Sequence, residues 1–253
     1  MIPIVEHRRP LALAAALCPI LILSCGRVPG QFEILNNQIP MSSGTGCLVP
    51  TSATAYQGQG TLDASIVRDG LPTAYFVFPL IENNLPGSTG GIDPNQIQLS
   101  GFTVDIGTIG LVPGGIQSAL TALAGSDLLH YQIPWSGGIS SGGGQLSAFV
   151  NAFPVALAQQ LLQTGALTLE PSLTVKLTIQ ALGTTNNGSK MTSDPFSYPV
   201  SVCAGCLVEN VASCPFATAP ANRGNPCNPA QDDPVDCCVD NGTLICPPTV
   251  VGQ

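Results

Sequence analysis

Cys203 and Cys206 form a C-x-x-C pair, the spacing in this chain most specific for site chemistry. The same spacing holds zinc in zinc ribbons, performs dithiol exchange in redox proteins and closes small structural disulfides. Zinc usually requires a second pair, and the sequence contains none. A reactive thiol needs a helix N-terminus, whereas Cys203 ends a strand-like alternating run. We therefore expect a structural disulfide, with zinc binding and redox chemistry as alternatives.

The segment Gly138–Gly142 matches the G-x-S-x-G pattern of a hydrolase nucleophile elbow, with Ser140 as the nucleophile. Such a serine needs a histidine base. His130 precedes Ser140 in the chain, whereas in that fold the acid and the base both follow the serine. The surrounding sequence is also rich in Gly and Ser, where chance matches are common. We expect a flexible loop here, with a hydrolase using Ser140 as the alternative.

Four acidic residues, Asp232, Asp233, Asp236 and Asp240, lie close together and precede Asn241-Gly242. Oxygen ligands in a glycine-containing turn are typical of calcium sites, but the EF-hand spacing is absent. We expect a solvated acidic loop, with a metal-dependent C-terminal segment as the alternative. The sequence of residues 183–190 is close to the pattern of a phosphate-binding loop. However, its Lys and Ser are transposed, and the segment joins two expected strands.

The cysteine count predicts a disulfide framework. Of ten cysteines, Cys18 and Cys25 lie in an apolar N-terminal segment. The other eight are an even number, as expected of an exported chain with four disulfides: Cys47, Cys203, Cys206, Cys214, Cys227, Cys237, Cys238 and Cys246. The neighbours Cys237 and Cys238 should have different partners. Because seven of the eight, an odd number, lie between residues 203 and 246, we predict that Cys47 bridges to one of them.

The N-terminal segment has the features of an export signal. Arg8 and Arg9 precede an apolar stretch from Leu11 to Leu23, which is shorter than the ~20 residues that span a bilayer. The stretch ends in Ile22-Leu23-Ser24-Cys25-Gly26, an aliphatic, a variable and a small residue followed by cysteine. This segment resembles the lipobox of bacterial lipoprotein precursors.

The resemblance implies that residues 1–24 are a signal peptide removed by signal peptidase II. Cys25 would then carry a diacylglycerol thioether and an amide-linked acyl chain such as palmitate. Gly26, in place of Asp, implies sorting to the outer membrane, and residues 25–50 would form a lipidated tether. Two or more acyl chains anchor a protein stably. The alternative is an ordinary secretory signal and a soluble exported protein.

Composition excludes several classes of function. Only 9% of the 253 residues are charged, and the net charge is −8. Seven cations cannot form the basic surface that a nucleic-acid-binding protein needs, so we expect no nucleic-acid partner. A hydrophobic content of 44% argues against a disordered chain, and 28 Gly with 23 Pro favour turns and short strands.

Alternating apolar residues predict strands over Ser172–Gln180 and Phe196–Val202, with the Asn187-Gly188 turn between them. Pro199 should leave the second strand paired on one side only at that point. The apolar run Thr73–Ile81 predicts a buried strand, Leu128–Trp135 a further strand, and a change of apolar parity at Gly101 predicts a β-bulge.

Helical spacing predicts a short helix at Ile116–Leu123 and a longer one over Leu146–Leu161, kinked or restarted at Pro154. Together these elements predict an antiparallel, Ig-like β-sandwich over residues 51–203 with one or two crossover helices. A cysteine-rich segment over 204–253 should follow it as a small appendage.

The sequence thus predicts a lipid-anchored protein of the bacterial cell envelope without catalytic activity. Its role would be structural, adhesive or the binding of an envelope protein or carbohydrate, an interpretation that depends on composition and fold class. We expect no cofactor. An envelope hydrolase or a metal-dependent C-terminal segment is the alternative.

Overall fold

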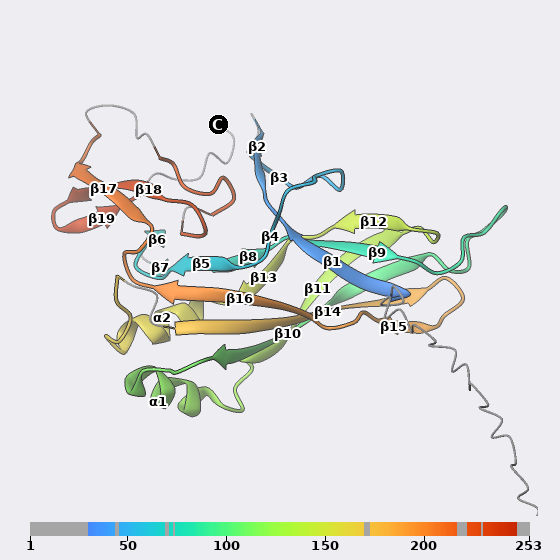
Figure 1. The fold of residues 1–253 in the computed structure, drawn as a ribbon, viewed down its shortest axis with the longest axis horizontal. Helices are drawn as coiled ribbons and strands as arrows, with labels where there is room; N and C mark the ends of the chain where they lie inside the picture. Colours follow the sequence, from blue (N-terminus) through green and yellow to red (C-terminus); the bar gives the residue numbers. More distant parts are fainter. Residues whose placement is uncertain are drawn as a thin grey trace, which may run out of the picture.

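The computed structural model describes residues 30–43, 46–68, 71–72, 74–169, 173–216, 222–228 and 230–246. The predicted signal peptide and Cys25 lie outside these ranges. The described chain is mainly β, with two helices and curled antiparallel sheets (Figure 1). The predicted fold class is confirmed.

The larger sheet contains the longest strands and has the order β11-β10-β14-β16-β5, with β15 also paired to β14. Its strands are β5 (Gly60–Asp63), β10 (Ile97–Ile109), β11 (His130–Ile139), β14 (Leu173–Thr185), β15 (Lys190–Thr192) and β16 (Phe196–Cys203). Alternate residues of β14 are buried, as its sequence pattern predicts. Pro199 pairs with Lys176 of β14, and β5 joins the other side of β16 only from Val200 onward. Pro199 is therefore paired on one side, as predicted.

The second sheet has the order β12-β9-β1-β4. Its strands are β1 (Phe32–Gln38), β4 (Tyr56–Gln57), β9 (Pro79–Asn83) and β12 (Gly144–Ser147). The expectation of a tether over 25–50 is wrong over β1, which buries Phe32 and Ile34 and pairs with β9. The apolar alternation ends after Ile34, because Leu35 and three polar residues follow it, and the pairing with β9 is what makes this segment a strand.

Four smaller sheets complete the described chain. They comprise β2 (Met41–Ser43) with β3 (Gly46–Leu48), β6 (Val67–Arg68) with β7 (Leu71–Pro72), β8 (Tyr75–Val77) with β13 (Val150–Phe153), and β17 (Val208–Ser213) with β18 (Val235–Asp240) and β19 (Thr243–Ile245). The expected strand Thr73–Ile81 is thus divided into β8 and β9, which belong to different sheets.

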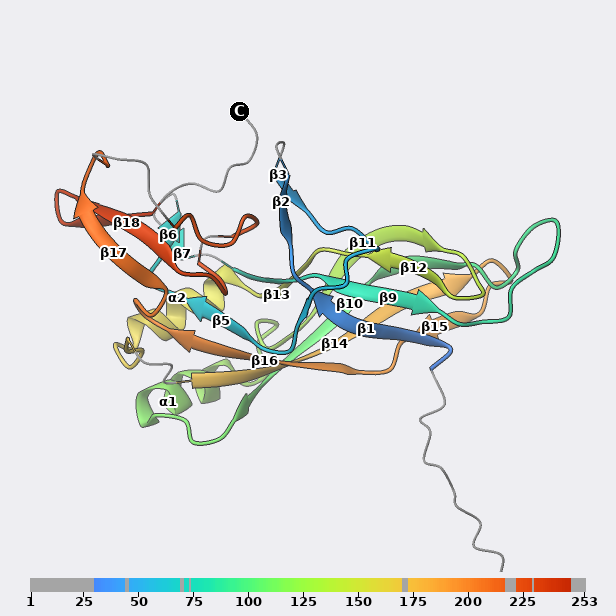
Figure 2. The same cartoon turned by 45° about the horizontal axis from the view of Figure 1, so that its top comes forward.

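One hydrophobic core lies between the sheets and extends under both helices. Helix α1 (Gly114–Leu123) contributes Ile116 and Leu120, in agreement with the predicted short helix. Both helices lie at the same end of the molecule as β17–β19, opposite the β9–β10 loop (Figures 1 and 2). Because β17–β19 belong to the cysteine-rich segment, we call them the cysteine-rich strands.

The longer predicted helix is wrong in its first half. Leu146 lies on β12 opposite Ile81, and Val150 lies on β13 opposite Val77. Only α2 (Val155–Gln163) is helical, and Pro154 immediately precedes it. Apolar spacing over 146–153 fits a helix by chance, and pairing with β8 and β9 overrides that local pattern.

The β-bulge expected at Gly101 is present. The register of β10 shifts between Leu99 and Gly101 relative to both β11 and β14. A Cβ atom at position 101 would lie 2.4 Å from the carbonyl oxygen of Ile133. The bulge therefore requires glycine, because the backbone of β11 occupies the space of a side chain.

Candidate functional site

All eight cysteines in the described chain are joined in pairs. The disulfides are Cys47–Cys227, Cys203–Cys206, Cys214–Cys238 and Cys237–Cys246. Cys47 bridges to the C-terminal segment across 180 positions, and the adjacent Cys237 and Cys238 have different partners, in agreement with the cysteine arithmetic. Cys203 and Cys206 form the disulfide that we expected between them.

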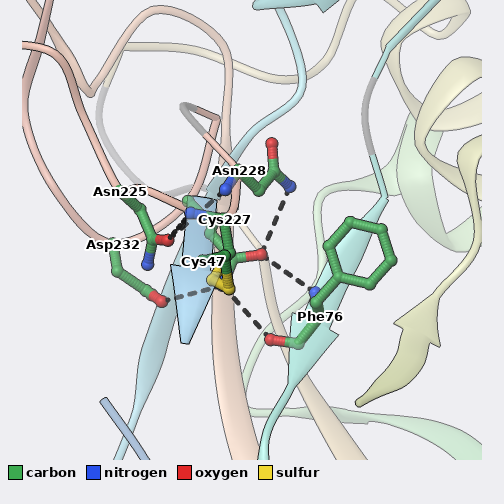
Figure 3. The surroundings of a disulfide bond; sticks show 7 residues. Cys47, Phe76, Asn225, Cys227, Asn228 and Asp232 are labelled. Carbon is green, nitrogen blue, oxygen red and sulfur yellow. Dashed lines mark hydrogen bonds between the residues drawn. A yellow bond between two sulfur atoms is a disulfide. The ribbon is translucent and has the colours of Figure 1, made fainter. Parts of the chain in front are cut away.

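The Cys47–Cys227 disulfide fastens a loop, residues 225–228 and 230–232, that docks on the edge of β8 (Figure 3). The Gln231 side-chain amide replaces a neighbouring strand: its Oε1 accepts from the Phe76 N–H at 2.9 Å, and its Nε2 donates to the Phe76 carbonyl at 3.2 Å. Asn228 Nδ2 donates to the carbonyl oxygen of Ala74. Side-chain amides thus satisfy backbone groups of β8 that would otherwise be unpaired.

The contact of this loop with strands β5 and β8 is called the junction below, and Asp232 forms its polar centre. Its Oδ1 accepts from the Tyr75 hydroxyl and from the Thr61 N–H, both at 2.9 Å. Burial raises the pKa of Asp232 to about 6, although these hydrogen bonds to the carboxylate partly oppose that rise. Tyr75 is fully buried and also lies 3.1 Å from the Tyr198 hydroxyl. Burial, followed by the charge of Asp232, raises the pKa of Tyr75 well above its ordinary value.

The junction also requires a glycine, Gly60, next to the Tyr75 hydroxyl. A Cβ atom at Gly60 would lie 1.9 Å from the Tyr75 hydroxyl oxygen. Ala230 and Val235, from the C-terminal segment, belong to the main hydrophobic core. Packing is therefore continuous across the expected boundary between residues 203 and 204, and the segment is no separate appendage.

A second buried carboxylate, Asp63, organises the Cys203–Cys206 loop. It accepts from the N–H groups of Gly205 (2.7 Å) and Leu207 (3.0 Å) and from the N–H and hydroxyl of Ser65. Within the described ranges, Asp63, Cys203 and Cys206 are the three potential metal ligands that converge within 4.8 Å. The disulfide occupies both sulfur atoms and the backbone donors occupy the carboxylate, so the arrangement is that of a braced turn.

The expectation of a solvated acidic loop is wrong for two of its four residues. Asp232 lies in the junction, and the largely buried Asp236 accepts from Asn210 Nδ2 and the Asn222 N–H. Asp233 and Asp240 are exposed. Local sequence cannot show that residues from distant strands cover half of this cluster.

Ser140 and His130 are not brought together. They lie at opposite ends of β11, and nine strand residues between them correspond to roughly 30 Å. His130 pairs instead with Asp105 on β10, and both side chains are solvent-exposed. The structure therefore does not assemble the base that the hydrolase alternative requires.

Three loops converge at the end of the sandwich remote from the cysteine-rich strands. We call this surface the loop end, and it comprises residues 84–96, 140–143 and 186–189. Asp93 connects the loops: its Oδ2 accepts from the Ser141 N–H (3.1 Å) and hydroxyl (2.9 Å), and its carbonyl accepts from Asn186 Nδ2 (2.8 Å). The backbone hydrogen bond from Ser141 is the largest cause of a lowered Asp93 pKa.

The loop end contains two segments that the sequence singles out for other reasons. The serine-rich G-x-S-x-G segment supplies Ser141, and the phosphate-loop-like segment forms the turn Thr185–Ser189 between β14 and β15. Asp93, Asp63 and Gln231 were not anticipated. For Asp93 a signal exists, because Asp-Pro-Asn favours the Asx turn in which its Oδ1 accepts from the Asn95 N–H.

Comparisons with known proteins found no matching family model, no matching curated protein and no matching solved structure. No helix in the described part of the chain is long and apolar enough to cross a membrane.

Proposed function

We propose that this chain is a lipid-anchored, non-catalytic protein of the bacterial cell envelope, with Cys25 as the lipidated residue. The cysteine pairing is the observation that carries the proposal. Eight cysteines pair with one another, so the disulfide framework leaves Cys18 and Cys25 over. Of these two, Cys25 follows the small residue Ser24 that the lipobox pattern requires, whereas Cys18 follows Leu17.

The disulfide framework supports an extracytoplasmic location, because disulfides persist in the periplasm and at cell surfaces. Gly26 after the lipidated cysteine favours the outer membrane. The separation of Ser140 from His130 supports a role in binding or structure in preference to hydrolysis.

A projecting hairpin supports a protein partner. Strands β2 and β3 extend away from the sandwich (Figure 1), and Met41 and Leu48 lie directly opposite each other on them. Both side chains are about half exposed, at 47% and 49%, and Ile39 at the base of the hairpin is exposed to 39%. Adjacent exposed apolar side chains are typical of protein interaction surfaces. The Cys47–Cys227 disulfide ties the hairpin to the C-terminal segment.

Fractionation of bacteria that express the full chain tests the anchor. The protein should sediment with membranes, resist extraction by high salt and be released by detergent, because two or more acyl chains anchor stably. Cys25→Ser should abolish lipid attachment, whereas the matched control Cys18→Ser should leave it intact. Membrane association that survives Cys25→Ser, or lipid attached when Cys25 is absent, would overturn the proposal.

A further inference from the structure

The first described residues, Gly30 and Gln31, lie at the loop end. Gln31 accepts from the Asn84 N–H at 2.8 Å, and Gly30 accepts from Asn84 Nδ2 at 3.2 Å. Asn84 directly follows β9 and opens the longest of the three loops. Figures 1 and 2 both show β1 starting at the same end as the β9–β10 loop.

The reach of the chain from Cys25 is short. Cys25 and Gly30 are five positions apart, and this length of chain spans at most about 18 Å even when fully extended. The 13 residues of β14 run about 40 Å from Thr185, at the loop end, to Leu173 near the cysteine-rich strands. A lipid on Cys25 would therefore hold the loop end near the bilayer, and it excludes an upright orientation in which the opposite end alone contacts the membrane.

The chemistry of the loop end suits contact with lipid headgroups. Asp93 is the single charged residue in its three loops, and hydrogen bonds from Ser141 and Asn95 already satisfy that carboxylate. Within these three loops, no other charge would therefore lose water on contact with the interface. Ile92, next to Asp93, is 86% exposed and offers an apolar side chain at the surface.

We propose that the loop end lies against the phospholipid surface, with Ile92 at the headgroup level and the cysteine-rich strands facing away. This proposal rests on the lipid anchor proposed above. It assigns the three loops to membrane contact, and it leaves the β2–β3 hairpin and the cysteine-rich strands accessible to partners.

Tryptophan fluorescence tests this orientation. The chain contains one tryptophan, Trp135, so the substitution Trp135→Phe gives a background without tryptophan. In that background, Ile92→Trp places the probe at the loop end. Tyr56→Trp on β4 and Val211→Trp on β17 place matched probes at exposed positions on the flank and at the far end. Each mature lipoprotein is purified and reconstituted in phosphatidylcholine vesicles that carry a headgroup nitroxide quencher.

The proposal predicts several-fold stronger quenching at position 92 than at positions 56 and 211. Quenching at 56 or 211 that equals or exceeds that at 92 would overturn the orientation. The mass of each preparation separates the two claims. A protein without lipid on Cys25 contradicts the anchor, whereas a lipidated protein with the wrong quenching order contradicts only the orientation.

Discussion

Single residues at the junction determine whether the C-terminal segment stays docked. Asp232 has a pKa of about 6 in the folded protein, against an ordinary value of 3.8. The folded state therefore binds the proton more tightly than the unfolded state does. Its contribution to stability is greatest below pH 4, falls as pH rises through about 6, and is constant above that. The shift corresponds to at most about 3 kcal/mol.

We expect Asp232→Asn to flatten this dependence, because asparagine does not titrate. Urea unfolding with disulfides intact, followed between pH 4 and pH 7, should show the folded state losing less stability in the variant than in the wild type. Asp240→Asn, at an exposed position, is the control and should keep the wild-type slope. Equal slopes in Asp232→Asn and the wild type would show that this carboxyl titrates normally.

Gly60 offers a steric test of the same junction. Gly60→Ala places a methyl group 1.9 Å from the Tyr75 hydroxyl oxygen, and Tyr75 is fully buried. We expect a loss of about 1–3 kcal/mol in the free energy of unfolding, typical of overpacking. Gly58→Ala, where a Cβ meets no atom within 4 Å, should change it little. An equal loss of stability in Gly60→Ala and Gly58→Ala would mean that the Tyr75 hydroxyl does not lie against Gly60.

Little of this junction was predictable at the residue level. Asp232 looks like one of four solvated acids, yet Tyr75 approaches it from 157 positions away. Gln231 carries no pattern that marks it as a partner for the backbone of Phe76. Such long-range contacts leave no local periodicity, whereas the Asp93 turn has a local signature that could have been recognised.

At the level of elements, strands with strict alternation were predictable and mixed segments were not. The sequence of β14 alternates from Leu173 to Gln180, and the parity change at Gly101 marks the bulge of β10. Residues 146–153 fit helical spacing but form β12 and β13, because neighbouring strands supply their hydrogen bonds. β1 was missed because only Phe32 and Ile34 mark its buried face.

The bulge of β10 is testable by a pair of substitutions in one strand. Gly101→Ala drives a methyl group to 2.4 Å from the backbone carbonyl of Ile133, which cannot move without breaking the pairing with β11. We expect a loss of about 1–3 kcal/mol. Gly107→Ala, also on β10 but in open space, serves as the control. Unfolding curves that coincide for both variants would contradict a bulge closed against β11.

At the scale of the whole molecule, the Cys47–Cys227 disulfide connects the β2–β3 hairpin to the C-terminal segment. It closes a loop across 180 positions, so in the chain-entropy model it contributes about 5 kcal/mol. The odd number of tail cysteines was sufficient to predict that Cys47 pairs there. Its partner among the seven was not predictable, because spacing alone does not specify connectivity.

We expect the double substitution Cys47→Ala/Cys227→Ala to destabilise the protein by several kcal/mol and to expose the Asn225–Asp232 loop to proteolysis. The double substitution Cys203→Ala/Cys206→Ala removes a disulfide that closes a far shorter loop. By the same model, it should lower the free energy of unfolding by less. Denaturant unfolding and limited proteolysis compare the two. A larger loss from the second pair would mean that the long-range bridge is not the main covalent constraint.

Intact mass spectrometry of the membrane-extracted protein tests both the disulfide framework and the lipid anchor on Cys25 in one measurement. We expect a chain that begins at Cys25, carries a diacylglyceryl group and an amide-linked acyl chain, and lacks the eight hydrogens lost in four disulfides. A mature chain that begins elsewhere without lipid, or one that retains free thiols among the eight cysteines, would contradict it.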